Sequence, residues 1–344
     1  MRHALVPALA LIAALAGPAS GFEVEARHRF GPPEAAAEVS VLATTDIAFF
    51  TPLAEAYLAL HPGLGIDYVQ AASQEVQRAV DEDRAPFDLV ISSAMDLQMK
   101  LANDGFAQAL PPDLVQAVPG WARWRDRLVA IALEPVVLLI AEAALDGAPP
   151  PRSRRDLIAL LRDHPETFAG RIGTYDPQVS GAGYLFLTQD ARMSDSIWRL
   201  AEVMGRLDAR LYCCSGAMIA GLLSGDLLVG YNVLGSYAAA NLPEESGVRV
   251  VPLEDFTITL QRTALVPANA AAPDQGAALL RFLLSDAGQR IQAEATGQGV
   301  MRPETFASQP WLRPIRLDPG LLSSLDSMTR ARFLAEWNAA LDQP

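Results

Sequence analysis

Short apolar runs alternate with helical spacings of apolar residues in the first part of the chain. A β-rich run at 39–43 is followed by three polar residues and then by helical spacing over 47–60. The same order recurs twice, with strands expected at 66–69 and 87–91 and helices at 73–83 and 94–103. Strand, polar cap and helix in alternation predict a parallel sheet with right-handed crossovers.

A second series of such signals follows a long apolar run at 128–145. This run contains Pro135, which cannot donate a hydrogen bond to a central ladder, so we expect it to cross between two lobes. Residues 256–266 alternate apolar and polar side chains and are long enough to return to the first lobe. The other expected elements are strands at 171–175, 211–213 and 227–233 and helices at 154–163, from about 182, from about 195, and at 216–223, 273–292 and 326–341.

These elements predict an α/β protein of two lobes joined by two crossing strands that form a hinge. The N-terminus carries an early arginine, an uncharged apolar stretch from Ala4 to Gly17 and small residues up to Gly21, which is typical of a cleavable signal peptide. We therefore expect export to the periplasm. The expected organisation is a signal peptide at 1–21, a surface leader at 22–38, lobe 1 at 39–134 and 262–344, and lobe 2 at 135–261.

The amino-acid composition limits the classes of partner and of chemistry that the chain can support. The 344 residues are 51% hydrophobic and 19% charged, and 27 basic residues against 40 acidic ones give a formal charge of -13. This balance predicts a folded core and disfavours a nucleic-acid partner, because no basic run is present to meet a phosphate backbone. Lys100 is the only lysine, so Schiff-base chemistry has a single candidate residue.

The order and spacing of four stretches resemble the periplasmic solute-binding proteins of bacterial ABC importers. The stretches are FDLVISS at 87–93, WARWRDRLVAIALEPVVLL at 121–139, GDLLVGYN at 225–232 and FLLSDAGQ at 282–289. The resemblance spans roughly 39–302 and is strongest for the two-lobed class, type II, that contains ferric-ion and organic-anion binders. It implies two lobes that close on a small solute and present it to a permease.

Within this class, Gly235-Ser236-Tyr237 is similar to the corresponding turn of phosphoglycerate-type regulatory binding proteins encoded with a sensor kinase. The resemblance therefore implies an alternative partner, the outer domain of a membrane histidine kinase. Genome neighbours would separate the two roles, because a permease and an ATPase accompany import whereas a kinase and a response regulator accompany sensing.

Candidate ligand-binding residues follow the expected strands, where helix N-termini direct amides and the positive end of the dipole toward a cleft. Hydroxyls and glycines at such places suit a carboxylate or a phosphate, although the same residues also serve simply as helix caps. Aromatic and amide side chains after the last strand of lobe 2 are further candidates. The candidates are Thr44, Thr45, Ser92, Ser93, Ser180, Gly181, Ala182, Ser215, Tyr231, Asn232 and Tyr237.

Ferric ion is the alternative ligand, because ferric members of the class use a pair of adjacent tyrosines. Here no two tyrosines are adjacent, which leaves Tyr231 and Tyr237 as the phenolate candidates. The histidines His28, His61 and His164 lack metal-ligand spacing. We therefore expect no metal and no cofactor in the first interpretation.

Cys213 and Cys214 are adjacent and are the only cysteines. In an oxidising compartment they could form a strained vicinal disulfide in the wall of the cleft, or remain two small buried apolar side chains. The pair is not a Cys-x-x-Cys motif, which disfavours thiol–disulfide enzymology.

The carboxylates Asp46, Asp96 and Asp176 have no accompanying histidine, and Ser180 is not in a Gly-x-Ser-x-Gly turn. The sequence therefore predicts a monomeric binding protein and not an enzyme. Its expected ligand is a small anion, such as a phosphorylated or carboxylated metabolite.

Overall fold

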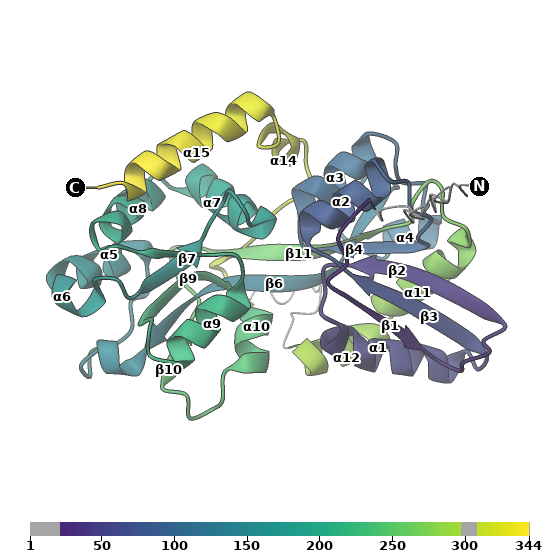
Figure 1. Cartoon of the computed structure of the whole chain (residues 1–344), viewed down its shortest axis with the longest axis horizontal. Helices are drawn as coiled ribbons and strands as arrows, with labels where there is room; N and C mark the ends of the chain where they lie inside the picture. The colour runs from purple at the N-terminus through teal and green to yellow at the C-terminus, as the bar shows by residue number, and fades with distance from the viewer. Residues whose placement is uncertain (1–20, 297–307, 344) are drawn as a thin grey trace, which may run out of the picture.

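The computed structural model describes residues 21–296 and 308–343 and shows two α/β lobes side by side, with strands β6 and β11 running between them (Figure 1). All strands belong to one twelve-stranded arrangement with the order β1-β3-β2-β4-β11-β6-β9-β7-β8. The predicted signal peptide lies almost entirely outside the described residues. The two-lobed α/β fold predicted from the sequence is confirmed.

Lobe 1 contains three parallel strands, β2, β3 and β4, with the edge strand β1 antiparallel to β3. The strands are β1 (Ala26–Phe30), β2 (Ala37–Ala43), β3 (Leu64–Gln70), β4 (Leu89–Ser92) and the short β5 (Arg123–Trp124). The helices are α1 (Ile47–Leu60), α2 (Ser73–Asp81), α3 (Met95–Asn103), α4 (Pro112–Gln116), the 3₁₀ turn η1 (Gly120–Ala122), α11 (Pro273–Leu284) and α12 (Asp286–Thr296).

Lobe 2 is built on β7, which pairs in parallel with β8 on one side and β9 on the other. The strands are β7 (Ile172–Tyr175), β8 (Arg210–Tyr212), β9 (Val229–Leu234) and β10 (Val248–Val251). The helices are the 3₁₀ turn η2 (Glu142–Ala144), α5 (Arg154–Asp163), α6 (Pro165–Phe168), α7 (Gly181–Met193), α8 (Ser196–Arg206), α9 (Ser215–Leu223) and α10 (Gly235–Asn241).

The hinge consists of β6 (Leu128–Ala141) and β11 (Thr257–Leu265), which pair antiparallel with each other. The first half of β6 pairs with β11 and its second half pairs with β9 of lobe 2. Pro135 lies at the change of partner, opposite Thr259. The long run that predicted a crossing is thus a single strand shared by both lobes.

Two terminal segments differ from the sequence prediction. The expected surface leader contains β1, whose residues pair with β3 and extend the sheet of lobe 1. The C-terminal segment was expected in lobe 1, but α15 (Ser327–Leu341) packs on α8, and Trp337 is buried in the core of lobe 2. Before α15, the C-terminal segment forms β12 (Leu312–Pro314), which pairs with β11, and α14 (Gly320–Ser323), which packs on α3 of lobe 1. The C-terminal segment therefore spans both lobes (Figure 1).

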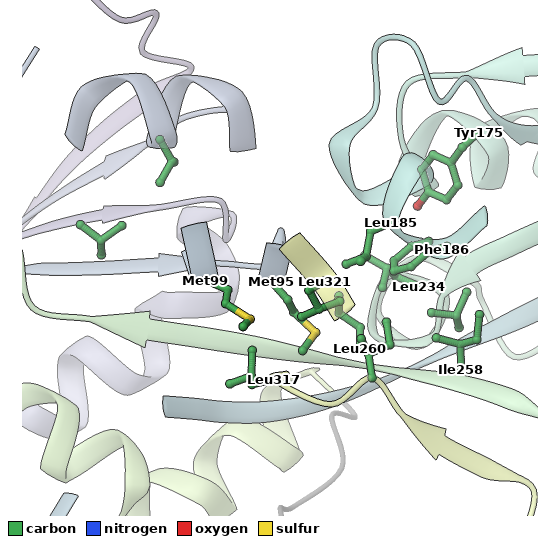
Figure 2. Close-up of a cluster of buried hydrophobic side chains, with 14 of the residues drawn as sticks. Met95, Met99, Tyr175, Leu185, Phe186, Leu234, Ile258, Leu260, Leu317 and Leu321 are labelled. Carbon is green, nitrogen blue, oxygen red and sulfur yellow. The ribbon is translucent and has the colours of Figure 1, made fainter. Parts of the chain in front are cut away.

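The apolar core continues through the hinge region. Figure 2 shows Met95 and Met99 of α3 near Leu317 and Leu321 of the C-terminal segment, with Leu260 of β11 beside them. Leu185 and Phe186 of α7 belong to the same cluster. Both lobes and the C-terminal segment therefore bury apolar surface in one shared cluster, which holds the lobes close together in this structure.

Candidate functional site

A pocket of about 490 Å³ lies between the lobes, at the carboxyl ends of the parallel strands. Its wall combines residues that follow β2, β3 and β4 in lobe 1 with residues at and after the ends of β7, β8 and β9 in lobe 2. This is the position at which α/β proteins of this arrangement bind ligands. The lining residues are Glu25, Thr44, Asp46, Ala71, Ala72, Ser73, Ser93, Tyr175, Val179, Ser180, Gly181, Ala182, Cys213, Cys214, Ser215, Gly216, Leu234 and Tyr237.

In lobe 1, two hydroxyls and two carboxylates are fixed by hydrogen bonds. The backbone N–H of Ser93 donates to Thr44 Oγ1 at 3.0 Å, and the two hydroxyl oxygens are 3.3 Å apart. The side-chain amide of Gln70 donates to Asp46 at 2.8 Å and to Glu25 at 3.1 Å. This wall therefore presents hydroxyls beside an acidic end.

In lobe 2, Ser180 is the N-cap of α7, since its Oγ accepts a hydrogen bond from the Gly183 N–H at 3.1 Å. Tyr175 at the end of β7 and Ser215 at the start of α9 are joined through their hydroxyls at 2.6 Å. Ser215 Oγ also accepts from the Leu234 N–H at 3.0 Å. These bonds fix the positions of three strand ends around the pocket.

Three helices begin at the pocket with amides that have no partner inside their own helix. The N-cap residues of α2 and α9 are Ala72 and Cys214, and neither side chain accepts a hydrogen bond from the first-turn amides of its helix. In α7 the Ser180 cap is bonded to Gly183, the third helical residue. The free amides and dipoles of α2, α7 and α9 place partial positive charge at three points of the wall, whereas Glu25 and Asp46 place negative charge on the lobe 1 side.

The lobes touch each other at the rim of the pocket. The ring of Tyr237 on α10 packs edge-on against Phe49 of α1 with centroids 5.4 Å apart. Burial raises the pKa of Tyr237 well above its ordinary value, and the carboxylate of Asp46 adds to the shift. A Cβ at Gly181 would come within 3.1 Å of Ser73 Oγ, so glycine allows the start of α7 to approach α2 closely.

The structure brings most of the predicted residues together. The pocket is lined by Thr44, Ser93, Ser180, Gly181, Ala182, Ser215 and Tyr237, and by the cysteine pair. Thr45 and Ser92 are buried behind the wall. Ser92 Oγ accepts from the Ala94 N–H at 3.1 Å and Thr45 Oγ1 accepts from Arg262, so both act as structural hydrogen-bond partners.

Tyr231 and Asn232 do not reach the pocket, which corrects the sequence prediction. Both side chains are buried in lobe 2, where each donates to Asp190 Oδ2 at 2.8 Å. Arg154 pairs with the other oxygen of Asp190 at 2.6 Å and donates to the Tyr231 hydroxyl at 2.8 Å. This internal network also separates Tyr231 from Tyr237, so the two cannot form the proposed ferric phenolate pair.

Several pocket residues were not among the predicted ligand contacts. Glu25 precedes β1, and no pattern in the sequence indicated that β1 belongs to the sheet. Tyr175 ends a strand directly before Asp176-Pro177, and Ser73 begins α2, so the rule that ligands sit after strand ends would have found both. Asp46 is a carboxylate without an accompanying histidine in the sequence, and the structure places it in the pocket wall.

No arginine or lysine is among the described residues that line the pocket. Arg262 on β11 is buried and donates to Thr45, but it is already paired with Glu134 on β6 at 2.5 Å. Ser236 of α10 donates to the other oxygen of Glu134 at 2.7 Å. The buried pair therefore links β11 to β6, and its outer hydrogen bonds link these strands to Thr45 of lobe 1 and Ser236 of lobe 2.

A second cavity of about 470 Å³ lies between α2, α3, α7 and the C-terminal segment. It contains Asp96, whose carboxyl group is almost completely buried. Burial raises the pKa of Asp96 to about 6, because the charged form loses its hydration. Between about pH 4 and 6 the folded chain keeps a proton that the unfolded chain releases, so stability falls as the pH rises through this window.

Asp96→Asn is therefore expected to stabilise the protein at pH 8 by up to about 3 kcal/mol, since two pKa units correspond to about that energy. An asparagine oxygen can still accept from the Leu97 N–H, as Asp96 Oδ1 does at 2.9 Å. Urea unfolding of both proteins at pH 4.5 and pH 8 measures the effect. The difference should shrink at pH 4.5, and parallel stability curves for the two proteins would contradict the assignment.

Among the residues described, none of the helices is long and apolar enough to cross a membrane. The same residues contain no group of three or more histidine, cysteine or acidic side chains suited to a metal ion.

Residues 39–296 match the family model described as bacterial extracellular solute-binding protein. Comparison with the curated proteins gives no significant match. A solved substrate-binding protein of an ABC transporter from Agrobacterium tumefaciens is 32% identical, with a TM-score of 0.86 over 94% of this chain and 100% of that one.

More distant structures share the fold. They include AfuA of Actinobacillus pleuropneumoniae with fructose-6-phosphate bound (15% identity, TM-score 0.70, 90% of this chain and 100% of that one) and iron-bound HitA of Pseudomonas aeruginosa (18%, 0.66, 88% and 99%). The family match covers most of the chain, and the Agrobacterium protein is similar over nearly its whole length. The chain therefore belongs to the bacterial extracellular solute-binding proteins.

Proposed function

We propose that the chain captures a small organic anion between its lobes in the periplasm and delivers it to an ABC permease. The observation that carries this proposal is the convergence of the N-termini of α2, α7 and α9 on one interlobe pocket. Hydroxyls of Thr44, Ser93 and Ser180 from both lobes line the same pocket. Amides, hydroxyls and helix dipoles together provide the donors that a phosphate or a carboxylate requires.

The carboxylates at the lobe 1 side of the pocket restrict the functional groups expected on the ligand. Glu25 and Asp46 lie on the lobe 1 side, whereas the starts of α7 and α9 lie on the lobe 2 side. An anion whose other end carries hydroxyl or ammonium groups satisfies both ends, since those groups donate to carboxylates. A phosphorylated polyol has this pattern, and AfuA was solved with fructose-6-phosphate.

Ferric ion is a weaker candidate here, although HitA binds iron. Its expected partner Tyr231 is engaged by Asp190 and Arg154 in the interior of lobe 2. Turnover is not part of the proposal, because the pocket has carboxylates and hydroxyls but no histidine among its described lining residues.

A thermal-shift screen of the exported chain tests the proposal. The ligands are inorganic phosphate, sugar phosphates, phosphoglycerate, dicarboxylates, thiamine and ferric citrate. An anion at 100 times its dissociation constant should add about 2.7 kcal/mol to the stability of the folded state. A response to phosphorylated or carboxylated compounds supports the proposal, whereas a response restricted to thiamine or to iron with a phenolate colour contradicts it.

A further inference from the structure

The cysteine pair lies in the wall of the ligand pocket. Cys213 and Cys214 follow β8 directly, both are exposed, and both line the pocket. Their sulfur atoms are 2.8 Å apart, so the two thiols are already on the same side of the chain. No third cysteine exists in the sequence, so an intramolecular disulfide has to join these two neighbours.

The surroundings hold the backbone on both sides of the pair. Tyr212 pairs with Tyr175 in the parallel β7–β8 ladder, and the Asp176 N–H donates to the Tyr212 carbonyl at 2.9 Å. On the other side Ser215 is bonded to Tyr175 and to the Leu234 N–H. Cys214 itself is the N-cap of α9, one of the three helices that begin at the pocket.

We infer that Cys213 and Cys214 are a redox modification site: they close to a vicinal disulfide by exchange with a small external disulfide, and this closure weakens anion binding in the pocket. The second half of this inference rests on the proposed function. The first half depends only on the positions of the two thiols.

The exchange consumes one external disulfide and yields two external thiols. The thiolate of one cysteine attacks an external disulfide RSSR, forms a mixed disulfide and releases one RS⁻. The thiolate of the other cysteine then attacks the protein sulfur of the mixed disulfide and releases the second RS⁻. The two cysteine protons end on two RSH molecules, and the pair has lost the two electrons that the external disulfide has gained.

A bond between neighbouring cysteines is readily reversible. Adjacent Cα atoms are about 3.8 Å apart, below the range of about 4.4–6.8 Å that an ordinary disulfide spans. Strained and exposed disulfides have higher reduction potentials and are the labile ones. The pair is therefore suited to respond to the thiol–disulfide balance of the periplasm and not to serve as a permanent cross-link.

Closure changes what the pocket offers an anion. Each thiol is a weak hydrogen-bond donor, whereas a disulfide has no donor. Hydrogen bonding to its neighbour raises the pKa of Cys213 to about 11, so this thiol stays protonated near neutral pH and does not repel an anion. Ring closure also restrains Cys214, whose backbone positions the first amides of α9.

The test starts from the reduced protein in buffers of glutathione and glutathione disulfide, followed by alkylation with iodoacetamide and intact-mass analysis. We expect a monomer that has lost two hydrogens and takes up no alkyl group. Cys213→Ser and Cys214→Ser, treated identically, should each retain one glutathione. Full alkylation of the wild-type pair, a stable bis-glutathione adduct or a disulfide-linked dimer would each overturn the modification site.

The coupling is tested by titrating both forms of the wild-type chain with inorganic phosphate by calorimetry. We expect the oxidised form to bind at least tenfold more weakly and dithiothreitol to restore the affinity. The double variant with serine at both positions should show the same affinity before and after oxidant. Equal phosphate affinities of the two wild-type forms would overturn the coupling between the disulfide and binding. If neither form binds phosphate, both the coupling and the proposed phosphate-type ligand are overturned. The mass analysis decides the modification site independently of these binding results.

Discussion

Arg262→Met is expected to lower the free energy of unfolding by about 3–5 kcal/mol, because it takes the paired guanidinium away from the buried carboxylate of Glu134. Arg262 and Glu134 are both almost fully buried and are joined by two hydrogen bonds at 2.5 and 2.8 Å. The guanidinium also donates to Thr45, so the variant removes a link between β11 and lobe 1 as well. Methionine fills much of the same space and limits any cavity effect.

Urea unfolding measures this loss, and Arg281→Met is the matched control. Arg281 pairs with Asp113 at 2.6 Å, but both side chains are about half exposed. Such a surface pair contributes no more than about 1 kcal/mol, so the control should unfold near the wild-type midpoint. Equal midpoints for the two variants would show that the buried Arg262–Glu134 pair contributes no more stability than the exposed pair, which contradicts the prediction.

Replacing both Arg262 and Glu134 distinguishes the energy of their ion pair from the cost of leaving one charge buried alone. Removing one partner exposes the full penalty of a buried charge, whereas an apolar pair of similar volume is often close to neutral. Glu134→Leu combined with Arg262→Met should therefore recover part of the stability that Arg262→Met loses. Recovery will be incomplete, because Ser236 and Thr45 lose their partners in the double variant.

The sequence predicted those elements whose boundaries are set locally. The helices expected at 47–60 and 154–163 coincide with α1 and α5. Local signals mark their ends, since His61-Pro62-Gly63 follows α1 and Ser153 caps α5. The helix expected at 326–341 is observed as α15, but the lobe on which it packs, and the pairing of β1, could not be predicted in this way. β1 has three exposed residues out of five, and α15 has few buried positions, so neither shows a periodic apolar face that indicates its partner.

The rule that ligands bind at the carboxyl ends of strands predicted the segments of the site correctly. It did not predict which side chains of those segments point into the pocket. Consecutive residues at a strand end point to opposite faces, so Thr44 and Ser93 reach the pocket while Thr45 and Ser92 turn inward. In β9, Asn232 adopts a left-handed φ of +64° beside an irregular register with β6, which interrupts simple alternation. The direction of Tyr231 was therefore not readable from the sequence.

Ser180→Asp is expected to weaken binding of an anion by about 100-fold without unfolding the chain. Ser180 lines the pocket and caps α7, and aspartate caps a helix about as well as serine. Because Ser180 lines the pocket, the new carboxylate would face a bound anion, and like charges about 5 Å apart repel each other by about 3 kcal/mol at an effective dielectric constant of about 20. The variant thus tests the sign of the ligand's charge.

Ser180→Asn isolates that charge, because asparagine has the shape of aspartate and the same capping ability. Calorimetric titration of both variants with the ligand found in the screen should show much weaker binding for the aspartate than for the asparagine. Their melting temperatures should agree closely, since the cap to Gly183 is kept in both. If aspartate instead strengthens binding, the ligand is a cation, and Glu25 and Asp46 become its counter-charges in place of the helix N-termini.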